Sequence, residues 1–241
     1  MPIFKPWGDG HDDVFVVDGV TLEAPNPPVS RSVRKSLQRN KYENAEAHLV
    51  RHLVCPGDTV LDLGAGLGLT AILAAKASGS GRVVAYEANP AIAPLAEKNA
   101  RRNGVQVEIR NRAIAARRGV CDFHLRRSFP ASSSIATKGS KTIHIEADAA
   151  QDVIDEIKPN VIVCDIEGIE REVLVESNLS SVQRMVVEVH PQIIGLSGVV
   201  ECAEALALAG LRLVPSLCFE QVLVFDRDGS AAAIPPFSSS R

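Results

Sequence analysis

The chain has 241 residues, a formal net charge of −3, 46% hydrophobic residues and 23% charged residues. This length predicts one domain with a substantial core, and the negative charge argues against nucleic-acid binding by the whole surface. Five scattered cysteines form no Cys-x-x-Cys pair, which favours reduced thiols over disulfides or a zinc site. We find no signal segment or membrane-length apolar run in the sequence, so we expect a cytoplasmic protein without a membrane partner.

Residues 1–41 predict an N-terminal arm. The segment is rich in proline, and two short apolar runs turn at Asp18-Gly19 as in a hairpin. Residues 31–41 carry five basic side chains and no acid. This stretch is either a solvated helix face or an arm that attracts an anionic substrate.

Residues 42–226 predict one α/β domain, in which strand and helix patterns alternate. Strands are expected at 59–63, 82–87, 105–112, 160–165, 183–189, 211–215 and 220–225. Helices are expected at 43–53, 67–78, 90–103, 150–157, 168–177 and 198–209, and Asn89 is expected to be the N-cap of the helix 90–103. Such alternation is typical of a mostly parallel, Rossmann-like sheet with helices on both faces, and the last two strands are close enough in sequence to be antiparallel neighbours.

Two further features interrupt this pattern. Residues 120–125 and 141–145 alternate like strands and predict a hairpin insertion, whose serine-rich tip at 128–140 is expected to be mobile. Residues 227–241 are rich in alanine, proline and serine and predict a flexible tail.

The segment 59–68 carries the clearest ligand-binding pattern. An apolar run containing Asp62 enters a turn with glycine at 64, 66 and 68, where a ligand can approach the main chain closely. We expect free N–H groups there to bind a carboxylate or phosphate. Leu69 stands where a dinucleotide fingerprint has its last glycine, and Asp62 would crowd a pyrophosphate. The pattern therefore favours S-adenosylmethionine.

An acidic residue, Glu87, ends the second predicted strand. A carboxylate about 20 residues after a glycine turn can accept hydrogen bonds from ribose hydroxyls. We therefore assign Glu87 to the ribose of the cofactor.

Two later strands bring acids and an imidazole to the same edge of the sheet, where α/β proteins bind ligands. Asp165 and Glu167 follow one strand; Glu188 and His190 end the next and point to the same side. His190 is a candidate general base because its unperturbed pKa lies near neutrality. Asp165 or Glu167 could be the base instead. The alternative to a catalytic role is helix capping for the two acids and a structural role for His190.

We predict no bound metal. His48 and His52 stand four residues apart, a spacing that can chelate a metal on a helix face, but the sequence suggests no third ligand. Asp165 and Glu167 offer oxygen ligands for Mg²⁺, again without an obvious third.

The chain resembles the FkbM-type S-adenosylmethionine-dependent methyltransferases. The matching motifs are Tyr42-Glu43, 60–68, 87–90, 165–170 and 187–190. The resemblance implies a seven-stranded methyltransferase sheet with its last strand antiparallel, and methyl transfer to hydroxyls of sugars or secondary metabolites. The chain departs from the family at Gly66-Leu67 and at Val163, which leaves the acceptor open.

From these patterns we expect an S-adenosylmethionine-dependent O-methyltransferase that acts on a small molecule, either anionic or sugar-containing. The alternatives are a non-catalytic cofactor-binding module, a nucleic-acid methyltransferase and a nicotinamide-dependent oxidoreductase. The expected catalytic residues are His190, Asp165 and Glu167. The expected cofactor-binding residues are Glu43, Asp62, Gly64, Ala65, Gly66, Gly68, Glu87, Ala88, Asn89, Arg112, Ala113 and Asp165.

Overall fold

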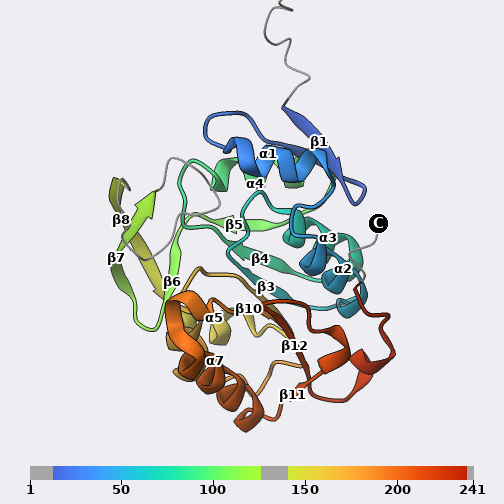
Figure 1. Ribbon diagram of the computed structural model, residues 1–241, viewed down its shortest axis with the longest axis vertical. Helices are drawn as coiled ribbons and strands as arrows, with labels where there is room; N and C mark the ends of the chain where they lie inside the picture. Colours follow the sequence, from blue (N-terminus) through green and yellow to red (C-terminus); the bar gives the residue numbers. More distant parts are fainter. Residues whose placement is uncertain (1–12, 126–140, 238–241) are drawn as a thin grey trace, which may run out of the picture.

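The structure is a computed structural model, which describes residues 13–125 and 141–237. Its centre is a seven-stranded sheet with the strand order β11-β12-β10-β9-β3-β4-β5 (Figure 1). The strands are β3 (Val60–Leu63), β4 (Val83–Tyr86), β5 (Glu108–Arg110), β9 (Val161–Cys164), β10 (Arg184–Glu188), β11 (Arg212–Leu213) and β12 (Val222–Asp226). The five strands from β10 to β5 are parallel, whereas β12 runs antiparallel to both β10 and β11. The predicted Rossmann-like sheet with an antiparallel last strand is confirmed.

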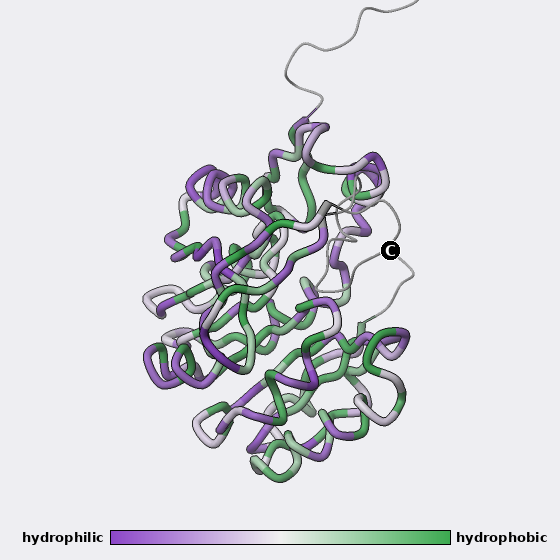
Figure 2. The backbone as a smooth tube through the Cα atoms, turned by 90° about the vertical axis from the view of Figure 1, so that its left-hand side faces the viewer, coloured by the Kyte–Doolittle hydropathy of each residue, from purple (hydrophilic) through white to green (hydrophobic). Residues whose placement is uncertain are grey.

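Alternate side chains of the central strands enter two separate hydrophobic clusters. Val60 packs in one cluster, while its neighbour Leu61 packs in the other. Both faces of the strands are therefore buried, as expected for a parallel sheet covered by helices. Hydrophilic residues gather on the outer turns of the helices, as Figure 2 shows.

Helices cover both faces of the sheet. The first cluster includes residues of α2 (Asn44–Leu53), α3 (Leu69–Ser78) and α4 (Ala93–Arg102). The second includes residues of α5 (Ala150–Ile157), α6 (Glu170–Val175) and α7 (Pro191–Leu208). The predicted two-sided arrangement is confirmed.

A second sheet of three strands stands beside the first. The predicted hairpin is present as β7 (Gly119–Leu125) and β8 (Lys141–Ala149), which pair antiparallel. A strand that the sequence did not predict, β6 (Ala113–Ala115), pairs parallel to β8. The predicted serine-rich tip lies outside the described residues.

The N-terminal region packs on the domain. The predicted hairpin forms as β1 (Val14–Val17) and β2 (Val20–Glu23), and the basic stretch forms α1 (Arg31–Gln38). Val33 and Leu37 of α1 are buried, and Arg34 pairs with Asp13 at 2.5 Å. Most of the basic helix thus lies beside β1 at the top of Figure 1.

Two helices begin at other residues than predicted. The helix expected from 90 begins at Ala93, because residues 89–92 form a separate turn in which the Asn89 side chain accepts a hydrogen bond from Ala91 N–H at 3.0 Å. The helix expected from 198 begins at Pro191 and is kinked at Gly195, whose φ is 71°. The described part of the expected flexible tail contains a 3₁₀ helix, Ser230–Ala233, and Phe237 packs edge-on against Phe219.

The prediction that the sequence has no apolar run of membrane length was wrong for helix α7. Its 18 residues are long and apolar enough to cross a bilayer by length and composition. In the structure it packs against α6 through one face, on which Cys202 and Leu206 are buried. Leu196 and Leu208 on its outer side are exposed.

Candidate active site

The glycine turn joins β3 to α3, and its first glycine allows a very close approach of two main chains. Gly64 has φ of 93°, and a Cβ at this position would lie 1.8 Å from the carbonyl oxygen of Asp165. Only glycine can occupy this position without displacing the end of β9.

The N–H groups of the turn are bonded within the protein, contrary to the expectation that they are free. Gly64 and Ala65 donate to the carbonyl of Tyr86 at 2.9 Å, Gly66 donates to Glu87 Oε2 at 2.8 Å, and Gly68 donates to the carbonyl of Ala65 at 2.7 Å. The turn therefore presents its bare glycine surface, and not a set of unpaired donors, to the neighbouring cavity.

Glu87 connects the glycine turn to the segment that follows β4. Its Oε2 accepts from Gly66 N–H, and its Oε1 accepts from Asn89 N–H at 2.7 Å. Burial raises the pKa of Glu87 to about 7. A carboxylate has about four acceptor positions, so Glu87 retains capacity for ribose hydroxyls.

Two side chains on neighbouring segments, Asp62 and Tyr42, hold the turn and the start of α3 by hydrogen bonds. Asp62 is buried and accepts from Thr70 Oγ1 at 2.7 Å, and burial raises its pKa to about 6. The Tyr42 hydroxyl accepts from Leu67 N–H at 3.4 Å. Asp62 is thus tied to α3 and lines neither of the two cavities described below, although the sequence predicted it to bind the cofactor.

A first cavity opens beside the turn and gathers most of the predicted cofactor-binding residues. The residues that the sequence assigned to the site and that line this cavity are Glu43, Gly64, Gly66, Glu87, Ala88, Asn89, Arg112, Ala113, Asp165 and Glu167. Asp62, Ala65 and Gly68 do not line it. The lining residues that sequence reasoning missed are Tyr86, Ile114, Cys121, Asp122, Phe123, Ile166 and Ile169.

The second sheet supplies one wall of the first cavity. Cys121 and Phe123 stand two residues apart on β7, so strand alternation was the available signal that they share a face. Arg112, before β6, forms ion pairs with Glu146 and, at 2.9 Å, with Asp148. These bonds anchor Arg112 to β8, and Ala113, the next predicted cofactor-binding residue, pairs with Ala147 of the same strand.

A second cavity, called here the acidic cavity, adjoins the first. Glu43, Asp165 and Glu167 line both. The acidic cavity also contains His190 and one lysine, Lys41. Its acidic lining residues are Glu43, Glu46, Asp165, Glu167, Glu188 and Glu220.

His190 is the best-oriented side chain of the acidic cavity. Its Nδ1 is hydrogen-bonded to Glu170 Oε1, and Glu170 is fully buried and also accepts from Gly168 N–H at 2.9 Å. Its Nε2 faces carboxylate oxygens of Asp165, Glu167 and Glu188 at 3.7, 3.8 and 3.9 Å. The structure thus brings the three predicted catalytic residues together. Glu170, which holds the histidine, was not predicted.

The concentrated negative charge perturbs the acids and the imidazole. Burial, with the charges of Glu188 and Glu167, raises the pKa of Asp165 well above its ordinary value, and burial likewise raises that of Glu43. Burial alone would lower the pKa of His190, but the hydrogen bond to Glu170 and the nearby carboxylates raise it overall. The site therefore favours an additional positive charge, whether a proton, a cationic ligand or a metal ion.

The first cavity offers acceptor groups that suit S-adenosylmethionine. Glu43 Oε2 is buried and has no hydrogen-bond partner among the described residues, so it can accept a hydrogen bond from the cofactor's ammonium group. Glu87 retains acceptor positions for ribose, and the glycine surface leaves room for close approach. The residues present fit this cofactor.

The whole fold is similar to that of a protein solved with S-adenosylmethionine bound. TYW2 of M. jannaschii, solved in complex with AdoMet, superimposes with a TM-score of 0.50 at 14% identity, covering 92% of this chain and 89% of that chain. The chain therefore has the fold of the class I S-adenosylmethionine-dependent methyltransferases.

The sequence comparisons agree with this class. The Methyltransferase small domain family matches residues 37–124. A protein named ribosomal protein L11 methyltransferase from Chloroflexus aurantiacus is 49% identical over 59 residues, 24% of this chain. The protein of the same name from Thermus thermophilus is 50% identical over 58 residues, also 24% of this chain. The chain spans only 18% and 22% of these relatives' own lengths.

The family and the relatives that match do not show the FkbM resemblance. S-adenosylmethionine, the predicted cofactor, is the cofactor of the class.

Proposed function

We propose that this protein transfers the methyl group of S-adenosylmethionine to a nucleophile held in the acidic cavity. The observation that carries the proposal is the wall shared by the two cavities, which is formed by Glu43, Asp165 and Glu167. A cofactor in the first cavity and an acceptor in the acidic cavity would meet at this wall. Alignment of the two and removal of water are the main contributions that such a protein makes.

The roles of the side chains follow from their positions. Glu87 would hold the ribose and Glu43 the ammonium group of the cofactor, while Asp165, Glu167 and His190 would surround the acceptor. His190 stays the predicted general base. Because its pKa is raised, it must lose its proton before it can accept one, so Asp165 and Glu167 remain the alternative bases.

We propose a hydroxyl group as the acceptor, in keeping with the predicted O-methylation. The acidic lining is compatible with a neutral, sugar-like molecule and repels an anionic one. The anionic alternative therefore has little support from this cavity.

The amine of a protein is the second candidate acceptor, and two observations favour it. The acidic cavity attracts a cationic amine, and the partial relatives are named for methylation of a ribosomal protein. In this case a carboxylate of the cavity would take the proton that the ammonium group must lose before it attacks.

Binding and transfer are tested separately. Thermal shifts with S-adenosylmethionine, S-adenosylhomocysteine and NAD should show stabilisation by the first two only. Tritium transfer from methyl-labelled S-adenosylmethionine, offered to polyhydroxylated small molecules and to ribosomal proteins in parallel, identifies the acceptor class. Binding without transfer to any acceptor would support the cofactor-binding module instead, and stabilisation by NAD alone would refute the proposal.

A further inference from the structure

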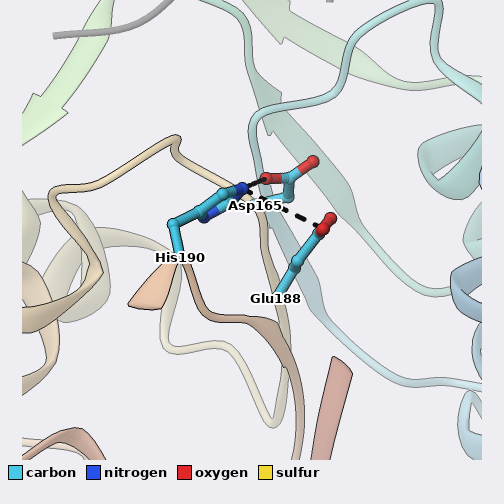
Figure 3. Close-up of side chains that lie close together, drawn as sticks. All are labelled: Asp165, Glu188 and His190. Carbon is cyan, nitrogen blue, oxygen red and sulfur yellow. Dashed lines mark ion pairs between the residues drawn. The ribbon is translucent and has the colours of Figure 1, made fainter. Parts of the chain in front are cut away.

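Three metal-ligating atoms converge in the acidic cavity. His190 offers a ring nitrogen, and Asp165 and Glu188 each offer a carboxylate oxygen; these atoms all lie within 4.8 Å of one another. Figure 3 shows the three side chains pointing toward a common centre. They come from the ends of adjacent strands β9 and β10 and from the residue before α7, so the parallel sheet itself brings them together.

The histidine is oriented as a metal ligand would be. Its Nδ1 is occupied by the buried carboxylate of Glu170, which leaves Nε2 to face the other two residues. The separations of Nε2 from Asp165 Oδ1 and Glu188 Oε1, 3.7 and 3.9 Å, are too long for hydrogen bonds. Histidines that bind metals characteristically use the other nitrogen in this way, bonded to a carboxylate or carbonyl.

One carboxylate oxygen of the cluster is both shielded and unsatisfied. Asp165 Oδ1 is buried and has no hydrogen-bond partner among the described residues, and it is the oxygen that lies 3.7 Å from His190 Nε2. A buried carboxylate oxygen without a partner is costly. A cation between this oxygen and the imidazole would satisfy both.

The spacing suits a single ion. Ligand atoms about 2.0 to 2.4 Å from one cation lie roughly 3 to 4.5 Å from one another, which includes the 3.7 and 3.9 Å that separate His190 Nε2 from Asp165 and Glu188. Imidazole nitrogen favours transition metals, whereas carboxylate favours Mg²⁺ and Mn²⁺. A mixed set of one nitrogen and two carboxylates points to Mn²⁺ or a similar divalent transition metal.

We propose that Asp165, Glu188 and His190 bind a divalent transition-metal cation that also coordinates the acceptor oxygen. This inference rests on the proposed function and deepens it, because it selects a hydroxyl acceptor over an amine. Asp165 lines both cavities, so the cation lies next to the wall through which the methyl group would pass.

The cation changes the role of His190 in the transfer. With Nε2 coordinated, the imidazole is a ligand and not a base, and Glu167, which also lines both cavities, takes the proton of the coordinated hydroxyl. The oxygen then attacks the methyl carbon through a lone pair. As the new O–C bond forms, the S–C bond breaks, and its electron pair stays on sulfur as a neutral thioether.

The test measures cation binding directly. The full chain is dialysed against EDTA, freed of chelator and titrated with Mn²⁺, with free Mn²⁺ followed by electron paramagnetic resonance and total binding by calorimetry. We expect one Mn²⁺ ion to bind per chain, and we expect Zn²⁺ to displace it. Affinity should rise with pH, because binding must displace protons from the cluster.

Variants locate the site. Glu188→Gln preserves side-chain shape and should weaken Mn²⁺ binding at least tenfold while leaving S-adenosylmethionine affinity unchanged, because Glu188 lines only the acidic cavity. His190→Gln should have the same effect if it folds, which circular dichroism checks. Glu172→Gln removes a carboxylate from the exposed side of α6 and should bind Mn²⁺ as the unaltered protein does.

Each outcome is decisive. Absence of stoichiometric binding of Mn²⁺ and Zn²⁺, or undiminished binding by Glu188→Gln, would overturn the cation site. If the unaltered protein binds Mn²⁺ but does not bind S-adenosylmethionine, the proposed function is refuted and the cation site is retained.

Discussion

Gly64 and Asp165 belong to adjacent strand ends, and their main chains are in such close contact that no side chain fits between them. A Cβ on Gly64 would lie 1.8 Å from the carbonyl oxygen of Asp165. The glycine turn and the first acid of the shared wall therefore form one rigid unit. Their relative position is set by the backbone and not by side-chain packing.

Substitution of Gly64 should disrupt both stability and cofactor binding. We expect Gly64→Ala to lower the free energy of unfolding by about 2–4 kcal/mol, because the methyl group clashes with main chain and the φ of 93° is strained for alanine. Urea unfolding measures the loss, and calorimetry with S-adenosylmethionine measures affinity. Gly119→Ala is the matched control, because no atom lies within 4 Å of a Cβ there. Equal stability of the two variants would contradict the steric argument.

Removal of the Glu170 charge should lower the pKa of His190. Glu170→Gln keeps an oxygen that can accept from Nδ1 but removes the buried negative charge that helps to raise this pKa. The imidazole resonances followed by NMR against pH should titrate at lower pH than in the unaltered protein. Glu172→Gln, with its side chain on the solvent side of the same helix, should leave the titration unchanged. A purely structural role for Glu170 would alter stability without this shift.

The stability of the protein should fall as pH rises through Glu87 ionisation. The pKa of this buried group is raised from 4.5 to about 7. Between these values the folded chain retains a proton that the unfolded chain has released, so the free energy of unfolding decreases with rising pH. The contribution of Glu87 is at most roughly 3.4 kcal/mol, since one pKa unit corresponds to about 1.4 kcal/mol.

The slope of stability against pH separates this effect from other consequences of substitution. Glu87→Gln leaves a donor facing the N–H of Gly66 or Asn89 and so loses stability at every pH, but its urea-derived stability should depend less on pH between 5 and 7.5. Asp62, with a pKa raised to about 6, retains part of the slope. Glu97→Gln, on the exposed face of α4, is the control. An unchanged slope in Glu87→Gln would be inconsistent with the raised pKa.

The sequence predicted the central sheet well because its strands are buried on both faces. Continuous apolar runs such as 161–164 have few alternatives to a central parallel strand. The short strand β6 was missed because its three residues pair with β8, more than 30 positions away along the chain. The early start of α7 was missed because Gly195, at a positive φ, interrupts the helical pattern after its first turn.

The candidate site was predicted in part for a similar reason. Residues at the ends of parallel strands, such as Glu87 and Asp165, were found because topology alone places them at one edge. Glu170 was missed, because a carboxylate in the first turn of a helix ordinarily stabilises the helix dipole. Its bond to His190 depends on tertiary packing of α6 against α7, which the local sequence does not encode.

Truncation of Phe123 should weaken cofactor binding without unfolding the domain. Phe123 lies on β7 and lines the first cavity from the three-stranded sheet, so its ring would cover apolar parts of the bound cofactor. Phe123→Ala should raise the Kd for S-adenosylmethionine about tenfold, which corresponds to about 1.4 kcal/mol of lost contact. Calorimetry measures the affinity, and thermal unfolding without ligand checks the fold.

The control for this substitution lies on the same strand. Val120 is exposed and does not line the cavity, so Val120→Ala should bind the cofactor with unchanged affinity. If Phe123→Ala also binds with unchanged affinity, the second sheet is not a wall of the cofactor site, and the ligand must lie nearer Gly64 and Glu87. If both variants bind weakly, the loss reflects damage to the β7–β8 pairing, because only that pairing is common to the two positions.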